Sequence, residues 1–437
     1  LSVGATAADS GARIAGAVDV ASGATLGGFG SIGGDVTIGG GAHLAPGDPA
    51  AGNGIGTLRI GGNLTLGAGS QLDFDFGAPS GVASVPGQGD SVSVGGHLSI
   101  SASTLNVRNA GGMGPGLYNL FTWGSGLTIA GGGFAPPAGS SVQILTSSKQ
   151  INLITAAGYT LNFWNGNGLA SPSQLGGGDG IWSATQPNWA DEGGVASGPL
   201  QPQPGFAIFG GAAGNVVVNT ADGAVAASGM QFASDGYRVS GGTLTLVADA
   251  GHPAPVEVRV GDGSSASAGW TATIANAVAG SDGLAKSGAG TLVLSGANSY
   301  TGGTTVRAGT LQVAADNNLG AAGEGLSLDG GTLRATSGFA THRAVTLGAG
   351  GGGVEVDPIQ VLGLNGAVSG DGALVKTGRG TLVLGAANSH TGGTAVNAGS
   401  LEAAVAGALG SGPVSVAANA SLLFTGSADA SGVTITA

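Results

Sequence analysis

The strongest candidate for covalent chemistry in this sequence is the tetrapeptide Gly89-Asp90-Ser91-Val92. Gly-Asp-Ser is part of nucleophile motifs in serine hydrolases, but acyl transfer also needs a histidine base and an acidic group that orients it. No histidine lies in a His-Gly-Thr sequence, and no Gly-Thr-Ser-Met-Ala sequence occurs; the five histidines are His43, His97, His252, His342 and His390. We therefore interpret Ser91 as the start of a strand and keep a serine hydrolase only as a remote alternative.

Metal and cofactor chemistry has little support. The chain has no cysteine, and no two histidines have zinc-ligand spacing. Asp73 and Asp75 alternate with Phe74, so both carboxylates should share one face of a strand, which we expect to be the outer face. Gly176–Asp179 resembles a calcium-binding repeat only distantly and is not repeated. We expect no cofactor and no metal.

Charge excludes two classes of partner. The chain has 12 Lys and Arg against 24 Asp and Glu, a net charge of −12, and only 8% of its 437 residues are charged. Without a basic patch, binding to nucleic acid or anionic lipid is not expected. The chain contains no run of 18 apolar residues, so we expect no transmembrane helix. The first residues, LSVGATAADS, are typical of a mature or trimmed N-terminus.

The elements that would position any site are repetitive. Residues 290–313 return at 380–403 with 16 of 24 positions identical. Within the first copy and after it, Gly-Thr-Leu recurs at Thr291, Thr310 and Thr332, which are 19 and 22 residues apart. A period near 20 built from Gly, Thr, Leu and Val predicts stacked strands and not helices.

We predict an all-β fold, a right-handed parallel β-helix of about 16–20 coils with protruding loops. Leu292, Leu311 and Leu333 should stack inside it, and glycines should form the corners. A single straight shaft of that many coils would be on the order of 75–95 Å long. Helix should be nearly absent, with one turn at most at 314–319.

The pattern divides the chain into three parts. Residues 1–160 read as N-terminal coils with loop excursions, 161–210 as an aromatic-rich irregular coil with a Pro-rich loop, and 211–437 as regular coils containing two repeats, at 281–320 and 371–410. Trp164, Trp182 and Trp189 lie in the middle part, where we favour a core role over a binding platform.

Partner contact should use segments that leave the shaft, because flat strand faces offer few apolar anchors. The candidates are 77–90, 131–141 and 196–206. The last contains the partner-binding candidates Leu200, Gln201 and Gln203, which we expect to be exposed. Lys286 and Lys376 hold equivalent places in the two repeats, which favours a solvated or capping position for each.

The sequence closely resembles a known family. Lys-x-Gly-x-Gly-Thr-Leu-x-Leu, then Asn-Ser-Tyr-Thr-Gly-Gly-Thr and Gly-Thr-Leu, run from Lys286 to Leu311 and again from Lys376 to Leu401, with Tyr300 replaced by His390. This phrase resembles the passenger-associated transport repeat of bacterial autotransporters. The phrases at 32–47 and 163–211 also resemble recurring phrases of such passengers.

The resemblance implies an extracellular or surface-held passenger exported by type V secretion. Its only membrane association would come through a C-terminal β-barrel that is missing here. We expect a monomeric shaft that acts as a non-enzymatic virulence factor by binding a host extracellular protein. A complement regulator or a serpin-type inhibitor is the sharper expectation. The alternative is an adhesin or autoaggregation module that binds matrix proteins or glycans.

Overall fold

The repeating unit of the structure is a short strand whose alternate residues face a common interior. The computed structural model describes residues 1–47, 54–77, 89–111, 113–146, 148–156, 160–166, 175–194, 197–248, 254–430 and 434–436. Within these residues, most strands pair in parallel with the equivalent strands of the coils before and after them. The predicted parallel β-helix is confirmed.

The first arm, up to residue 155, is built from two sheets. In spatial order, the described strands of the first sheet are β1 (Arg13–Ile14), β4 (Ser31–Ile32), β7 (Thr57–Ile60), β10 (Ser91–Val94), β12 (Gly116–Trp123), β15 (Gln150–Thr155) and β14 (Ser140–Leu145). Those of the second are β2 (Val18–Val20), β5 (Val36–Ile38), β8 (Leu64–Leu66), β11 (His97–Gly111), β9 (Gln71–Gly77), β6 (His43–Pro46) and β3 (Thr25–Gly28), with β13 (Gly126–Ala135) paired to β11.

The second arm, from residue 161 onward, is built from three sheets. The first contains β19 (Ser197–Gly198), β18 (Trp189–Ala190), β16 (Leu161–Trp164), β20 (Gly205–Phe209), β22 (Val225–Phe232), β25 (Val256–Val260), β28 (Leu284–Ser287), β30 (Thr304–Val306), β32 (Leu326–Leu328), β35 (Val345–Leu347) and β38 (Val368–Gly370), with β24 (Leu244–Leu246) and β27 (Val278–Ala279) to one side. The second contains β17 (Gly180–Trp182), β21 (Asn215–Val218), β23 (Arg238–Gly241), β26 (Thr271–Ile274), β29 (Thr291–Leu294), β31 (Thr310–Val313), β33 (Thr332–Ala335), β36 (Gly352–Val356), β39 (Leu374–Thr377), β41 (Thr394–Val396), β43 (Val414–Val416) and β45 (Ile435–Thr436). The third contains β34 (Phe339–Thr341), β37 (Val361–Leu364), β40 (Thr381–Leu384), β42 (Gly399–Ala403) and β44 (Ala420–Phe424).

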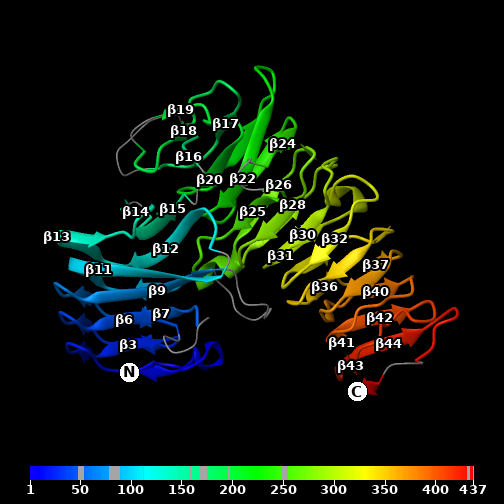
Figure 1. Ribbon diagram of the computed structural model, residues 1–437, viewed down its shortest axis with the longest axis horizontal. Coiled ribbons are helices and arrows are strands. Elements are labelled where there is room, and N and C mark those ends of the chain that lie inside the picture. Colours follow the sequence, from blue (N-terminus) through cyan, green and yellow to red (C-terminus); the bar gives the residue numbers. More distant parts are fainter. Residues whose placement is uncertain are drawn as a thin grey trace.

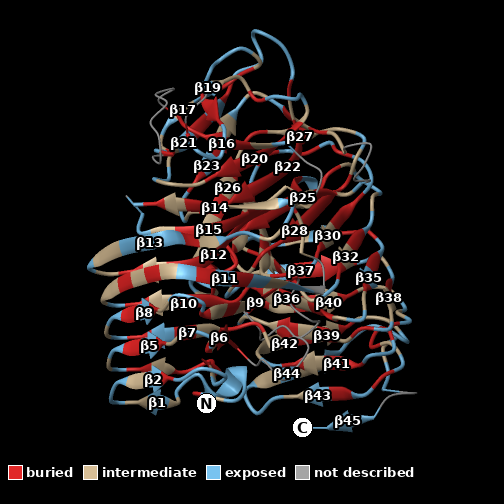
Figure 2. Cartoon of the chain, turned by 60° about the vertical axis from the view of Figure 1, so that its left-hand side comes forward, coloured by how far each residue is buried: buried red, intermediate tan, exposed pale blue. Residues whose placement is uncertain are grey.

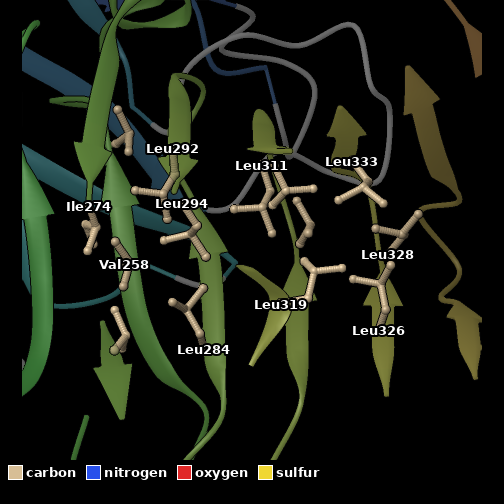
Figure 3. Packing of buried hydrophobic residues seen from close by; sticks show 14 of the residues in the cluster. Val258, Ile274, Leu284, Leu292, Leu294, Leu311, Leu319, Leu326, Leu328 and Leu333 are labelled. Atoms are coloured by element: carbon tan, nitrogen blue, oxygen red, sulfur yellow. The ribbon is translucent and has the colours of Figure 1, made fainter. Parts of the chain in front are cut away.

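The interior of the second arm is a continuous ladder of aliphatic side chains. Leu292 pairs with Leu311 and Leu311 with Leu333 in successive coils, and all three are fully buried. Figure 3 shows these leucines side by side, with Leu284 and Leu326 on the facing strands. The predicted stacking is confirmed, because the two-residue alternation of a strand gives every coil the same inward positions.

The two transport-like repeats use different faces of the arm. In the first, β28 and β29 belong to the first and second sheets of that arm; the equivalent β39 and β40 of the second repeat belong to the second and third sheets. The 90 residues between the repeats therefore hold four coils plus one additional face. Equivalent outward residues of the two repeats point in different directions, which is the behaviour of scaffold and not of a site duplicated on one surface.

The two arms fold back on one another, so the expectation of one straight shaft is wrong. Figure 1 shows the first arm in blue and cyan, the second from green through yellow to red, and both termini at the same end. Figure 2 gives the same arrangement from another side. Each arm has its own apolar core, one ending at Leu153 and the other beginning at Trp164. The described strands stack over five levels in the first arm, from β1 to β12, and over twelve in the second, within the predicted number of coils.

Antiparallel pairing marks the apex where the arms meet. β15 pairs antiparallel with β12 and β14, and β18 pairs antiparallel with β16 and β19. A third, smaller apolar core joins the arms there, with members from both, among them Leu117, Ile154, Phe206 and Ile208. The coil regularity stops at this point, and a local sheet closes the end of the first arm.

Buried polar side chains fix the arms below the apex. The backbone N–H of Leu117 donates to Gln231 Oε1 at 2.7 Å, and Gln231 Nε2 donates to the carbonyls of Leu117 and Gly261 at 2.7 and 2.9 Å. The guanidinium of Arg259 lies 3.9 Å from the ring centroid of Tyr118. Since Gln231 is fully buried, breaking one of its hydrogen bonds would leave a buried polar atom without a partner.

Helix is confined to single 3₁₀ turns in the described chain: η1 (Ala7–Asp9), η2 (Ser265–Gly269) and η3 (Asp316–Leu319). The predicted turn at 314–319 is η3. It ends at Gly320, whose φ of +85° is left-handed and suits glycine. No described helix is long and apolar enough to cross a membrane.

Candidate functional site

Ser91 lies in a hydroxyl cluster and not beside a base. It begins β10, as predicted, and is 2% exposed. Its Oγ is 2.8 Å from Thr57 Oγ1, which is 2.9 Å from Ser265 Oγ of the other arm. Among the described residues no histidine is hydrogen-bonded to Ser91, and His252 lies outside them. The cluster joins the two arms.

Three of the four described histidines, His43, His97 and His390, have hydrogen-bond partners, and His342 is exposed. His43 Nδ1 is 2.6 Å from Asp73 Oδ2, and His97 Nε2 is 2.8 Å from Thr128 Oγ1. Across residues 1–47, 54–77 and the other described ranges, no three His, Asp or Glu residues are grouped to hold a metal. Asp179, of the glycine-rich segment, accepts the backbone N–H of Asn215 at 2.6 Å and so ties one coil corner to the next.

Asp75 lies on the outer face of β9, as predicted, but a side chain of the next strand covers it. It alternates with Phe74 and Phe76 as predicted, yet it is only 8% exposed. Arg108 on the adjacent strand makes a two-pronged ion pair with it, and Arg108 Nε lies 2.6 Å from Asp75 Oδ1. Next to this pair, Asp90 accepts the N–H groups of Gly56 and Asp75, both at 2.8 Å. Burial raises the pKa of Asp90 well above its usual value. These contacts hold the strands together.

The three central tryptophans fill the apex of the second arm. Trp164, Trp182 and Trp189 are at most 2% exposed. The ring of Trp189 meets those of Trp164 and Trp182 edge-on, with both pairs of centroids 5.1 Å apart, and packs on Phe209 at 5.4 Å. The interpretation of these residues as core is confirmed, and they offer no aromatic platform to a ligand.

Leu200 is not an exposed contact residue. Its side chain is fully buried in the same core as the tryptophans, so the expectation that it is exposed is wrong. The Pro-rich turn presents Gln201 and Gln203 to solvent, while the N–H of Gln201 donates to Asn162 Oδ1 at 3.2 Å. An apolar residue at the base of an otherwise polar turn anchors it, which is why the sequence alone misplaced Leu200.

The other two segments predicted to contact a partner are 131–141 and 77–90. Segment 131–141 contains the end of β13, a turn and the start of β14, and most of it is solvent-exposed. At its end, Ser141 Oγ donates to Glu192 Oε2 at 2.7 Å, which ties this edge of the first arm to the second. Almost all of segment 77–90 lies outside the described residues.

Lys286 and Lys376 are buried, so the expected solvated position is wrong and capping is their role. Each lies in the inward column of its strand and is fully buried. Lys286 Nζ donates to the carbonyls of Ser287, Gly288 and Ala308 at 2.8, 2.7 and 3.0 Å. The first two carbonyls form the coil corner and the third belongs to the next coil. Burial lowers the pKa of Lys286 to about 7.

Lys376 repeats this arrangement one face further round the arm. Its Nζ donates to the carbonyls of Thr377, Gly378 and Ala398 at 2.7, 2.9 and 3.1 Å. Burial lowers its pKa to about 8. An ammonium group has three donors and no acceptor, so three carbonyls satisfy it completely.

A shallow hollow on the first arm carries unpaired positive charge. Arg13, Ser31, Arg59 and Ser93 follow one another in register across β1, β4, β7 and β10, and they point outward, opposite the buried Ile32 and Ile60.

The glycines Gly33, Gly61 and Gly95 stack at the corner beside this column. A Cβ on Gly95 would lie 2.7 Å from the carbonyl oxygen of Gly61, so side chains are excluded there and the surface is hollowed to about 850 Å³. We call the four column residues and these three glycines the first-arm hollow. Sequence reasoning missed it, because Arg13 and Arg59 lie 46 residues apart and only strand register brings them together.

The family comparison matches the part of the chain that carries the buried lysines. The model of the passenger-associated transport repeat matches residues 284–313 and 374–403. The chain is also 40% identical over 386 residues to the protein named "Adhesin BmaC autotransporter" of Brucella suis biovar 1 (strain 1330). The chain belongs to the autotransporter passengers.

The alignment with this relative covers 87% of the passenger described here but only 11% of the relative. No solved structure matches the chain. As an autotransporter passenger, the protein acts at the bacterial surface or outside the cell, which it reaches by type V secretion.

Proposed function

We propose that this passenger adheres to host surfaces by non-covalent contact, without catalysis. The observation that carries the proposal is the 40% identity, across 87% of the chain, to a relative named as an adhesin. Of the two binding functions considered from the sequence, this favours adhesion.

The architecture suits adhesion. Two buried lysine clamps and continuous aliphatic ladders make a stiff support, because each coil packs on its neighbours along its whole length. Outward positions are polar; for example, Thr291, Thr310 and Thr332 form a threonine ladder on the second arm. Such a support holds exposed turns, among them the one with Gln201 and Gln203, in fixed positions.

The sharper expectation, capture of a complement regulator or a serpin-type inhibitor, has no support in the name of the relative. The relative is also far longer than this chain, so the activity of the whole protein bears only indirectly on this part. A host extracellular protein or glycan is the class of partner that remains proposed.

The test is adhesion of beads coated with the purified chain to monolayers of host epithelial cells. We expect more bound beads than with albumin coating, and competition by soluble chain. Equal binding of both kinds of bead would refute the adhesive function. Parallel incubation of chain-coated beads with human serum would reveal, by selective enrichment of a regulator or serpin, the alternative partner.

A further inference from the structure

The first-arm hollow places two positive charges in one column, two strands apart, beside a recess in the surface. The first 160 residues contain four cations, and two are engaged: Arg108 with Asp75, and Lys149 with the carbonyl of Gly124. Within the described chain neither Arg13 nor Arg59 forms an ion pair, and both are exposed.

Asp9 and Asp35 form no ion pair with these guanidiniums and have other hydrogen-bond partners. Asp9 accepts the N–H of Thr6 at 3.1 Å, and Asp35 accepts the N–H of Asn63 at 2.8 Å. Arg59 has one weak polar contact, at 3.4 Å, with Ser265 Oγ of the second arm. That contact places the second arm at the rim of the hollow, and it leaves most donors of the guanidinium free.

Spacing and shape define the ligand. Arg13 and Arg59 are two strand steps apart, so their backbones lie about 10 Å from one another. Each guanidinium can hold a carboxylate or sulfate group through two parallel hydrogen bonds. Between and beyond them, Ser31 and Ser93 present hydroxyls, and the corner of stacked glycines leaves room for a flat chain to lie across the strands.

We propose that the first-arm hollow binds an acidic polysaccharide, a sugar chain carrying regularly spaced carboxylate or sulfate groups. Two anionic groups one disaccharide apart would form ion pairs with Arg13 and Arg59. Sugar hydroxyls would form hydrogen bonds with Ser31 and Ser93. The net charge of −12 repels polyanions in general. Recognition must therefore come from this local site, since charges beyond about 8 Å are screened at physiological salt. The inference names a ligand class for the proposed adhesion and rests on that function.

The probes are oligosaccharides of hyaluronan, which carries only carboxylates, and of heparin, which also carries sulfates, with dextran as the neutral control. Binding to immobilised oligosaccharide is measured for the whole chain and for Arg13→Gln, Arg59→Gln and the double variant. The matched control is Arg238→Gln with Arg307→Gln, which removes the same charge from exposed positions of the second arm. Retained circular dichroism shows that each variant is folded.

We expect at least one acidic probe to bind and dextran not to bind. Each single substitution should weaken binding about tenfold and the pair about a hundredfold, because the glutamine amide can keep one of the two hydrogen bonds and loses the other, charge-assisted one. The control pair should change binding less than about twofold. Preference for hyaluronan or for heparin would identify carboxylate or sulfate as the recognised group.

Three results would overturn the proposal: no binding of either acidic probe, equal weakening by the control pair, or tighter binding of a poly-glutamate peptide, which would assign the hollow to acidic protein. Bead adhesion is measured on the same variants. If chain-coated beads still adhere while the acidic probes fail, only the ligand class is refuted and the adhesive function survives.

Discussion

Replacing Lys286 with Met should destabilise one coil by an amount that depends on pH. The substitution keeps an unbranched apolar side chain of similar length but removes the donor for the carbonyls of Ser287, Gly288 and Ala308. Ala308 lies in the next coil, so the contact between coils is weakened as well as the corner.

The expected size follows from the buried carbonyls that lose their donor. Lys286→Met leaves the carbonyls of Ser287, Gly288 and Ala308 without this partner, at about 1–3 kcal/mol for each buried group. Part of this loss is offset because the folded variant no longer buries an ammonium, whose burial is unfavourable enough to lower its pKa to about 7. We therefore expect a net loss of about 2 kcal/mol near pH 6.

The pH dependence has a definite sign. Between pH 7 and 10.5 the unfolded chain keeps the proton on this lysine while the folded chain has released it, so stability rises with pH across that window. The stability difference between wild type and Lys286→Met should therefore grow by about 2–3 kcal/mol from pH 7 to pH 9. For Lys376, whose pKa is lowered to about 8, the rise should begin about one unit higher.

The assay is hydrogen exchange by mass spectrometry over residues 284–313, converted to opening free energies at pH 6, 7, 8 and 9. The control is Arg307→Met, which removes an exposed cation of the same repeat and should change stability by less than about 0.5 kcal/mol. Parallel pH profiles for wild type and Lys286→Met, or equal effects of the two substitutions, would refute the buried clamp.

Three further predictions follow from named contacts. His390→Tyr introduces, at a buried position, the residue that the first repeat has there. Burial lowers the pKa of His390, so the wild type should lose protection from hydrogen exchange over 374–403 as pH falls below 6.5, and the variant should not. Hydrogen exchange of both proteins at pH 7 and 5.5 measures this difference. Trp189→Ala should cost about 3–5 kcal/mol in thermal unfolding followed by near-ultraviolet circular dichroism, and a loss under about 1 kcal/mol would contradict its core role. Gln231→Leu should broaden the distribution of distances between spin labels at Thr37→Cys and Thr346→Cys, one on each arm. The control Gln312→Leu, at an outward position, should leave that distribution unchanged.

The sequence was sufficient for whatever depends on local periodicity. The spacing of Thr291, Thr310 and Thr332 predicted the stack because each coil repeats the same inward and outward positions. The same alternation could have located the buried lysine, since Lys286 follows Leu284 by two residues and so shares its inward face. The reasoning failed there because charge was taken as a sign of exposure.

The fold-back of the arms was beyond sequence reasoning because it depends on contacts between distant residues. Gln231 lies in an ordinary apolar strand, and its partner Leu117 is 114 residues earlier. The sequence around neither residue indicates that the two arms make contact there. The first-arm hollow was missed for a related reason: its arginines become neighbours only when the lengths of the intervening coils are known.

The most direct test of the account is a binding isotherm of the fluorescently labelled chain on host cells. It is compared with a variant whose exposed repeat positions are changed by Arg307→Ser and Asn397→Ser, on the two differently oriented repeats. If the repeats are scaffold and adhesion uses other surfaces, both proteins should bind saturably with the same Kd. Absence of saturable binding by the wild type, or loss of binding in the repeat variant, would contradict the account.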